Sequence, residues 1–372
     1  MLEWVILFHG DLLTKEQLDS VHASRSIENS AKARFQHIIF IPGLFHYKMA
    51  CVDTFWRIWV KPKEGRQDES SMMEHMGTLR PDDTGKFGSL PGFRMVHDAI
   101  NHDLTASLLD CWLLEAKKRF PSCSSLDDFA AAGLSWEEIV AMSEDIVENY
   151  VATSPVITEL RDKRPQHRDH RFENQILRNR NELLYIDMCY AINAGDIGCV
   201  EASIAPWVLM FRATGKHKYA THMLNFIKDL KDRYPPELSR IIRMNWLVNP
   251  SGRPDSFCGV DWLVELNNLY TKVIYAGGSS NHTINHIIKE SPLIELYREC
   301  HMAVEHGFHL VNQTVWHAPP NMKLIFRLLG KKFTKNTPHA FTVGQNCYSA
   351  NIEDETDEPT GIEPDDLGAE FT

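Results

Sequence analysis

The chain has 372 residues, of which 43% are hydrophobic, 10% aromatic and 24% charged. This composition is typical of a globular protein and excludes a wholly disordered chain, a collagen and a coiled coil. The formal net charge is −11, but residues 353–372 hold nine acidic side chains and no basic one. Subtracting these nine charges leaves −2 for the rest of the chain, so the charge does not exclude a nucleic-acid partner.

The sequence lacks the features of a membrane or secreted protein. No apolar run approaches the roughly 18 residues that a membrane-spanning helix needs. The apolar start of the chain is too short, and its charge is wrong, for a signal peptide. The eight cysteines are scattered and form no Cys-x-x-Cys motif, which indicates reduced thiols and no disulfide scaffold or zinc ribbon. We therefore expect a nuclear or cytoplasmic protein that is not secreted and has no membrane partner.

Two short apolar runs near the amino terminus predict strands. They lie at residues 4–8 and 38–41, and each stops near a glycine. Between them, Thr14 followed by Gln17 three residues later has the spacing of a helix N-terminal capping box. Continuous apolar runs separated by a helix are typical of buried parallel strands. We therefore expect the two strands to pair as parallel neighbours.

The rest of the chain divides by composition and periodicity. Residues 61–96 are rich in Gly, Pro, Asp, Ser and Met without a clear period, which predicts a loop or insertion. Helical periodicity dominates residues 97–335, and within it residues 260–275 are expected to pack back on the start of the chain. Residues 336–372 lose this pattern and predict an acidic, disordered tail. The predicted fold is α+β and predominantly α-helical, with a small parallel α/β core at residues 1–60.

Two parallel strands cannot form a stable sheet alone. Either residues 272–275 supply a further strand, or the chain is a truncated form from which the early strands are missing. We favour truncation.

The ends of the two predicted strands carry candidate catalytic side chains. Asp11 follows the first strand, and ligands and catalytic acids gather at the carboxyl ends of strands in open α/β sheets. His46 follows the second strand and would neighbour Asp11 if the strands are parallel. Each residue also has a structural interpretation, in which Asp11 caps the next helix and His46 is hydrogen-bonded where a helix begins. Glu265 lies among apolar residues of a predicted helix, where a carboxylate is paired with a cation or holds a metal unless it lies at the surface margin.

Two clusters of basic residues are candidate phosphate-binding surfaces. The first lies between residues 161 and 180 and includes Lys163, Arg164, Arg168, Arg171, Arg178 and Arg180. The second has no acidic residue within it and comprises Lys323, Arg327, Lys331, Lys332 and Lys335. Solvated helix ends and linkers are the alternative for both clusters. Histidine pairs occur at short spacings without a third ligand nearby in the sequence, so zinc has little support.

Several blocks of the sequence resemble, in the same order, a family abundant in mushroom-forming fungi that is catalogued as a domain of unknown function. The main blocks are GDLLT at residues 10–14, PGLFHYKMA at 42–50, GDIGCVE at 195–201, NWLVNPSGRPDSF at 245–257 and VELNN at 264–268. The order of elements also resembles the core of cut-and-paste transposases with an RNase-H-like fold. In those enzymes three carboxylates hold two magnesium ions for phosphodiester hydrolysis and strand transfer.

This resemblance implies roles for particular residues. Asp11 would be the second acid and Glu265 the third, both as Mg²⁺ ligands, while His46 would orient the site. Asp196 and Glu201 are rival acids. The chain departs from the family pattern after Glu265, where relatives carry histidine, and at residues 221–222, where they often carry glutamate. If either position is essential, these departures imply a decayed copy.

We therefore expect a truncated, inactive transposase-like protein of mobile-element origin, whose ancestral reaction is metal-dependent phosphoryl transfer on DNA. If active, it would be a magnesium-dependent nuclease or transposase that contacts DNA through the basic clusters. The alternative is a non-enzymatic helical module that binds protein or nucleic acid. The first hypothesis requires Asp11 and Glu265 to lie close together, and the second expects them to lie apart or to be individually paired.

Overall fold

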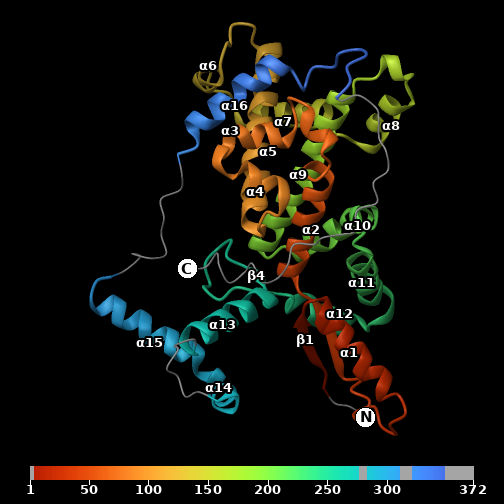
Figure 1. Cartoon of the computed structure of the whole chain (residues 1–372), viewed down its shortest axis with the longest axis vertical. Helices are drawn as coiled ribbons and strands as arrows, with labels where there is room; N and C mark the ends of the chain where they lie inside the picture. The colour runs from red at the N-terminus through yellow and green to blue at the C-terminus, as the bar shows by residue number, and fades with distance from the viewer. Residues whose placement is uncertain (1–3, 276–282, 311–320, 348–372) are drawn as a thin grey trace.

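The computed structural model describes residues 4–275, 283–310 and 321–347 (Figure 1). Its strands and α-helices are, in chain order, β1 (Ile6–Gly10), α1 (Leu12–Ser24), β2 (Ile38–Pro42), α2 (Leu44–Trp59), α3 (Met72–Leu79), α4 (Thr84–Ser89), α5 (Phe93–Arg119), α6 (Leu126–Ala131), α7 (Trp136–Tyr150), α8 (Ser154–Asp162), α9 (His170–Ala194), α10 (Ile197–Ala213), α11 (His217–Lys228), α12 (Pro236–Met244), β3 (Leu247–Val248), β4 (Cys258–Gly259), α13 (Val260–Tyr275), α14 (Ile284–Glu290), α15 (Ile294–Gly307) and α16 (Lys323–Asn336). The structure is α+β and predominantly helical, which confirms the predicted fold class.

The chain begins with a β1–α1–β2 unit whose strands are parallel. The register pairs Ile6 with Ile38 and ends where Gly10 pairs with Pro42. The parallel pairing predicted from the two apolar runs is confirmed, although β1 begins and ends two residues later than the predicted run. Because parallel strands end at the same edge, the residues that follow Gly10 and Pro42 are brought to one place.

The two strands differ in burial, which the apolar runs did not predict. Ile41 of β2 is fully buried, whereas Phe8 of β1 is 46% exposed. Within the described residues, β1 and β2 form a two-stranded sheet with no third strand. Residues 272–275, considered above as a further strand, belong to helix α13 instead. One face of β1 is exposed because the sheet has only these two strands and nothing in the described chain covers β1 on that face.

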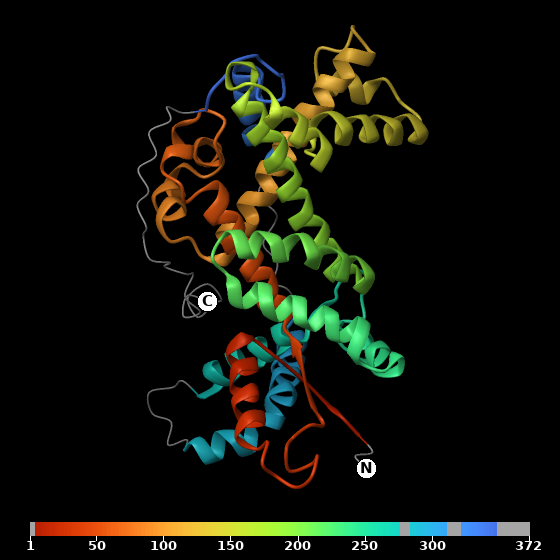
Figure 2. The same cartoon turned by 90° about the vertical axis from the view of Figure 1, so that its right-hand side faces the viewer.

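The main hydrophobic core lies among the helices that follow β2. Helix α2 is apolar around most of its circumference and buries Leu44, Tyr47, Val52 and Phe55 completely. It packs against α5, α9, α10 and α13, and one continuous cluster of buried side chains joins α2 to α5, α9 and α10. Figures 1 and 2 show α5 and α9 at one end of the elongated molecule, whereas α1 and the α13–α15 segment lie at the other. Helix α2 connects the two ends.

Three local predictions need correction. The N-cap of α1 is Asp11, whose carboxylate accepts a hydrogen bond from the Thr14 backbone N–H, so Thr14 lies within the first turn. Residues 61–96 contain the short helices α3 and α4, because Ser71 caps α3 and the apolar side chains of both pack into the core. Residues 336–347, predicted as part of a disordered tail, include the buried His339. The remainder of that tail, residues 348–372, lies outside the described residues.

In the described part of the chain, none of the helices is both long and apolar enough to cross a bilayer.

Candidate functional site

The parallel strands bring Asp11 and His46 to the same edge of the sheet. Asp11 follows β1 directly, and its Oδ1 accepts a hydrogen bond of 2.8 Å from the Thr14 backbone N–H. His46 lies in the first turn of α2, which follows β2. The structural interpretation of Asp11 therefore holds, since its carboxylate satisfies one of the N–H groups that have no partner within helix α1.

A third carboxylate, from a distant part of the sequence, completes this edge. Asp261 lies in the first turn of α13 and is only 3% exposed. Its Oδ1 accepts a hydrogen bond of 3.1 Å from the Phe45 backbone N–H, and its Oδ2 accepts one of 3.0 Å from the His46 backbone N–H. The His46 ring nitrogen Nδ1 lies 2.9 Å from the same Oδ2. Asp261 thus caps helix α2 from another helix and also holds the His46 ring.

Two glycines make room for this carboxylate. Gly43 is the N-cap residue of α2 and has no side-chain oxygen to offer. A Cβ at Gly43 would overlap the Asp261 carboxylate, and a Cβ at Gly259 would overlap the same carboxylate and crowd the Phe45 backbone nitrogen. Any larger residue at either position would therefore displace Asp261. Glycine is a common N-cap residue, so Gly43 gives no sequence signal that α2 is capped from elsewhere in the chain.

The charges around His46 change its protonation behaviour. Burial lowers its pKa, but the hydrogen bond and charge of Asp261, together with the charges of Asp11 and Glu265, outweigh burial and raise the pKa above its usual value. The structure therefore brings all three predicted residues, Asp11, His46 and Glu265, into one electrostatic neighbourhood. Burial also lowers the pKa of His9 in β1. The negative charge of Asp261 raises that pKa, but burial has the larger effect, so the net shift is downward.

The donor groups at this edge bear on the metal-ligand role predicted for Asp11 and Glu265. In the described residues there is no group of three or more His, Cys, Asp or Glu side chains arranged to hold a metal ion. Both oxygens of Asp261 already accept hydrogen bonds, and one oxygen of Asp11 does so too. A divalent cation needs several oxygen lone pairs directed at one point. Among the described contacts, three of the four oxygens of Asp11 and Asp261 instead accept hydrogen bonds from helix N-termini, and one of these three also contacts the His46 ring.

The rival acids have structural partners as well. Asp196 caps α10 by accepting a hydrogen bond of 3.0 Å from the Cys199 backbone N–H. Glu201 forms a two-pronged ion pair with Arg243. Neither residue contributes to the edge formed by Asp11 and Asp261.

The first basic cluster is largely neutralised within the fold. Arg168 pairs with Glu173 at 2.9 Å, Arg171 with Asp68 at 3.2 Å and Arg178 with Asp103 at 3.2 Å, each distance joining a guanidinium nitrogen to a carboxylate oxygen. Of the remaining members, Lys163 and Arg164 are exposed and Arg180 is half-buried. Lys163 lies over the Phe341 ring. The sequence could not show this, because Asp68 and Asp103 come from distant segments.

The second basic cluster forms an exposed stripe on α16. Lys323, Arg327, Lys331 and Lys335 recur every fourth residue and are all exposed. Residues at this spacing share one face of an α-helix. Lys332 lies on another face, where its Nζ donates a hydrogen bond of 3.0 Å to the Glu74 carbonyl oxygen.

A buried polar network that the sequence did not reveal joins α3, α5 and α9. The His75 Nδ1 lies 2.5 Å from an oxygen of Asp103, which also faces Arg178. Burial opposes ionisation of Asp103, but the charges of His75 and Arg178 outweigh it and lower the pKa of this carboxyl. The neighbouring Glu182 is fully buried, and burial together with the charge of Asp103 raises its pKa well above the usual value.

A second part of this network has the residue types of a hydrolase triad. The Ser107 hydroxyl oxygen lies 3.1 Å from Nε2 of His339, and Nδ1 of that ring lies 2.8 Å from Asp110. However, Ser107 is fully buried and its hydroxyl donates to the Asn179 side-chain oxygen at 2.7 Å. A nucleophile must be accessible and activated by its histidine. The arrangement therefore serves to attach the chain around residue 339 to α5 and α9.

Several of the sequence blocks quoted above meet next to the strand-end site. The Trp246 indole N–H donates a hydrogen bond of 2.8 Å to the Pro42 carbonyl oxygen at the end of β2. The Phe257 backbone N–H donates to the Asn193 carbonyl oxygen, and the Phe257 ring packs against Gly195, whose left-handed backbone ends α9. These blocks therefore build the joint between β2, α9 and α13.

Comparison with known proteins identifies the family but no characterised relative. No curated protein and no solved structure shows a significant match to the chain. A family model described as a family of unknown function, DUF6589, matches residues 2–317. Because this match covers most of the 372 residues, the chain belongs to the DUF6589 family.

Proposed function

We propose that this protein is a transposase-like protein of mobile-element origin that does not itself carry out phosphoryl transfer on DNA. The proposal is based on the hydrogen bonds that the strand-end carboxylates already accept. Both oxygens of Asp261 accept hydrogen bonds from the N-terminus of α2, and one of them also contacts the His46 ring, while Asp11 caps α1. Metal-dependent phosphoryl transfer needs such oxygens for its ions.

The likeness to a transposase rests on the arrangement of the elements. A parallel strand–helix–strand unit ends in Asp11 and is followed by His46, and a later helix brings Glu265 into the same neighbourhood. In an ancestor with a working site, Asp11 and Glu265 would have been two of the acids, and His46 would have oriented them. In this chain Asp261 fixes His46 against the start of α2 instead.

A cleavage assay on DNA tests the proposal. The purified chain is incubated with supercoiled and linear DNA in the presence of Mg²⁺ or Mn²⁺, beside the Asp11→Asn, Glu265→Gln double variant. The double variant of two exposed acids, Asp19→Asn and Glu137→Gln, is the matched control. We expect no cleavage by any of the three proteins. Cleavage by the wild type and the control that is lost in the Asp11, Glu265 variant would overturn the proposal.

A second candidate function, binding of nucleic acid, is favoured by the stripe on α16. Its four basic side chains are exposed and lie about 6 Å apart along the helix axis. Arg327 has an acidic neighbour, with its guanidinium 3.4 Å from the exposed Asp127 carboxylate. Exposed ion pairs of this kind are weak and are exchanged readily for other partners. We propose that this stripe contacts the phosphates of a nucleic acid without reading its sequence.

The salt dependence of DNA binding tests this second function. Each phosphate contact contributes about −0.9 to the slope of log affinity against log salt concentration, so four contacts predict a slope of about −3.6. Changing all four basic residues of the stripe to glutamine should abolish most of this slope in a fluorescence-anisotropy titration with duplex DNA. A Lys163→Gln, Arg164→Gln variant is the comparison from the other basic cluster. Equal slopes for the wild type and the stripe variant would exclude α16 as the contact surface.

A further inference from the structure

The face of α16 that carries the basic stripe also exposes apolar side chains. No acidic residue lies within this helix. Leu324 is 67% exposed and Leu328 is 45% exposed. Each leucine lies three residues before a basic member of the stripe, Arg327 or Lys331, and is therefore its neighbour on the helix surface. Contacts with phosphates make no use of leucine side chains, so this face suits a ligand that combines negative charges with apolar groups.

The acidic segment at residues 353–372 has this composition. It contains nine acidic residues and no basic one, and Ile362, Leu367 and Phe371 are interspersed among the acids. The exposed basic residues at the end of α8 are less complementary to it, because Glu159 and Asp162 lie among them. The opposite charges are therefore best matched between the acidic segment and the stripe on α16.

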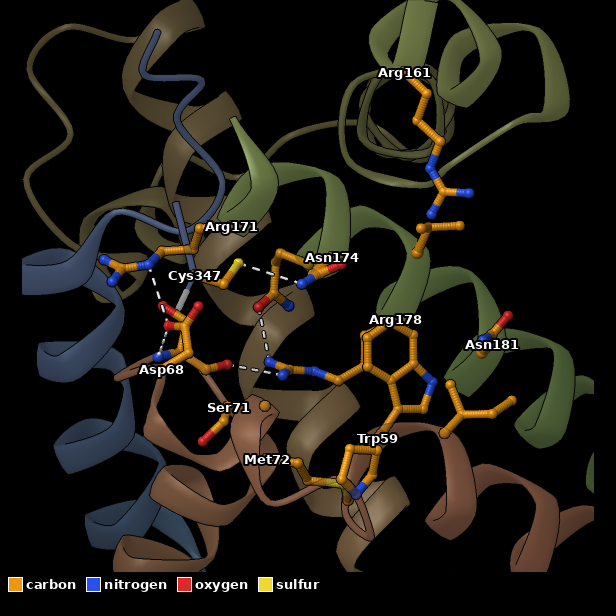
Figure 3. A pocket seen from close by; sticks show the side chains of 16 residues that line it. Trp59, Asp68, Ser71, Met72, Arg161, Arg171, Asn174, Arg178, Asn181 and Cys347 are labelled. Atoms are coloured by element: carbon orange, nitrogen blue, oxygen red, sulfur yellow. Dashed lines mark hydrogen bonds and ion pairs between the residues drawn. The ribbon is translucent and has the colours of Figure 1, made fainter. Parts of the chain in front are cut away.

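The last described residue of the chain lies close to the end of α16. The Cys347 Sγ accepts a hydrogen bond of 3.3 Å from the Asn174 side chain, and this cysteine lies beside Asp68 (Figure 3). At the end of α16, the Asn336 side chain donates a hydrogen bond of 3.1 Å to the carbonyl oxygen of Glu69, the next residue after Asp68. One short segment thus contacts both the end of α16 and the residue from which the chain continues toward the acids.

The acidic segment is long enough to reach the stripe. Five residues separate Cys347 from Glu353, the first acid, and these can span at most about 20 Å. The stripe from Lys323 to Lys335 extends over about 18 Å of helix. Because the segment is tethered to the fold, its effective concentration at the stripe is in the millimolar range. Contacts that are individually weak are therefore sufficient to hold it there.

We propose that residues 353–372 dock on the α16 stripe and compete there with nucleic acid. Their carboxylates pair with the four basic side chains, and their apolar side chains cover Leu324 and Leu328. The competition rests on the second proposed function, in which the stripe contacts phosphates, whereas the docking itself can be measured without DNA. A nucleic acid must displace the acidic segment before it reaches the stripe, so docking weakens its binding.

Carbodiimide cross-linking of the full chain, read by mass spectrometry, tests the docking without DNA. The reagent joins a carboxylate to a lysine amine that is in contact with it. We expect cross-links from residues 353–372 to Lys331 and Lys335 at low salt, and a severalfold loss of these products at about 0.5 M salt. Lys218 of α11 is the control, because it is exposed and lies outside both basic clusters. Cross-links to the stripe no more frequent than those to Lys218, or mainly to Lys163, would overturn the proposal.

Two variants of the full chain test the competition in fluorescence-anisotropy titrations with duplex DNA. In the first, all nine acids of residues 353–372 become amides, and DNA should bind about tenfold more tightly at low salt if the segment binds the stripe at about one tenth of its effective concentration. The second is the Leu324→Gln, Leu328→Gln variant, which keeps every charge and should tighten DNA binding at least about threefold by releasing the segment. Leu209→Gln, at an exposed leucine of α10, is the matched control and should change nothing.

The results separate docking from simple repulsion between the acids and DNA. Tighter binding by the amide variant, with the leucine pair behaving like Leu209→Gln, would indicate long-range repulsion and would overturn the docking. Cross-links that persist unchanged in the leucine variant would also contradict it, since the apolar contacts would then contribute nothing. If cross-links to the stripe form but none of the proteins binds DNA, the docking stands and the second proposed function is wrong.

Discussion

Replacing Asp261 by asparagine removes a negative charge from the joint between α13 and the start of α2. The carboxylate faces three donors, which are the backbone N–H groups of Phe45 and His46 and the His46 ring. An asparagine keeps only one acceptor oxygen, so in either orientation its amino group must face at least one of these donors. The variant therefore loses part of the cap and the charge-assisted contact with the ring.

The magnitude can be worked out from these contacts. Loss of an N-cap costs about 1 kcal/mol, and loss of a hydrogen bond to a charged group costs about 1.5–3 kcal/mol. Both groups are shielded from water, since the His46 and Asp261 side chains are 20% and 3% exposed. We therefore expect Asp261→Asn to lower the free energy of unfolding by about 2–4 kcal/mol at mildly acidic pH.

The stability that Asp261→Asn loses should decrease as the pH rises. The folded state raises the pKa of His46, so the protonated ring contributes stability that is fully present below the pKa of an unfolded histidine, about 6.5. That contribution is lost as the pH rises through the folded-state pKa. The difference in stability between the wild type and Asp261→Asn should therefore be largest near pH 5.5 and shrink toward the cost of the cap alone at about pH 8.5.

Denaturant unfolding at a series of pH values, with NMR titration of the His46 ring, measures both effects. Glu265→Gln is the matched control, because Glu265 lies one turn further along α13 and also raises the pKa of His46. It caps no helix N-terminus, so we expect it to cost less than about 1 kcal/mol. The reasoning would be refuted if Asp261→Asn cost no more than Glu265→Gln, or if its cost increased with pH.

Three further substitutions probe the fold around this joint and the buried network. Trp246→Phe should cost about 1–3 kcal/mol, because it leaves the Pro42 carbonyl oxygen without its indole donor; an unchanged denaturant midpoint would contradict this. Glu182→Gln should stabilise the protein increasingly as the pH rises from about 4.5 to 8. In the unfolded chain Glu182 ionises in this range, whereas in the folded protein its pKa is raised, so the wild-type carboxyl opposes folding more strongly at higher pH. Thermal melts of both proteins at the two ends of this range check the trend. Gly259→Ala should lower the melting temperature, whereas Gly307→Ala, where a Cβ meets no neighbouring atom, should not; equal melting temperatures for the two variants would exclude the steric argument.

The sequence predicted the parts of the fold that depend on local pattern. Two continuous apolar runs around a helix were enough to predict β1 and β2 as a parallel pair. The same pattern could not predict burial, because burial depends on which other elements cover each strand. Of the two cap residues considered from the sequence, the helix uses Asp11 and not Thr14, although only Thr14 has a glutamine three residues later.

The partner of His46 could not be predicted from local pattern. Asp261 is separated from His46 by 215 positions, and an acid near the start of a helix usually stabilises its own helix. Gly43 at the N-cap of α2 gives no indication of an acid from another segment, since Gly92 also begins a helix without a side-chain cap. The basic residues between positions 161 and 180 pose the same difficulty, since Arg171 and Arg178 look free in the sequence until the fold brings Asp68 and Asp103 to them.

The hydrogen bonds at the strand ends also predict how the protein responds to Mg²⁺. A helix N-terminus carries about half a positive charge, so the α2 and α1 N-termini already compete for the carboxylates of Asp261 and Asp11. A cation that recruited these oxygens would have to remove two caps, at a cost of about 1 kcal/mol each, and the folded state would gain little net stability from binding it. A site that binds a ligand at one hundred times its dissociation constant stabilises a protein by about 2.7 kcal/mol. We therefore expect the melting temperature to be the same with and without millimolar Mg²⁺, and a rise that the Asp11→Asn, Glu265→Gln variant loses would show that the carboxylates exchange their helix caps for metal.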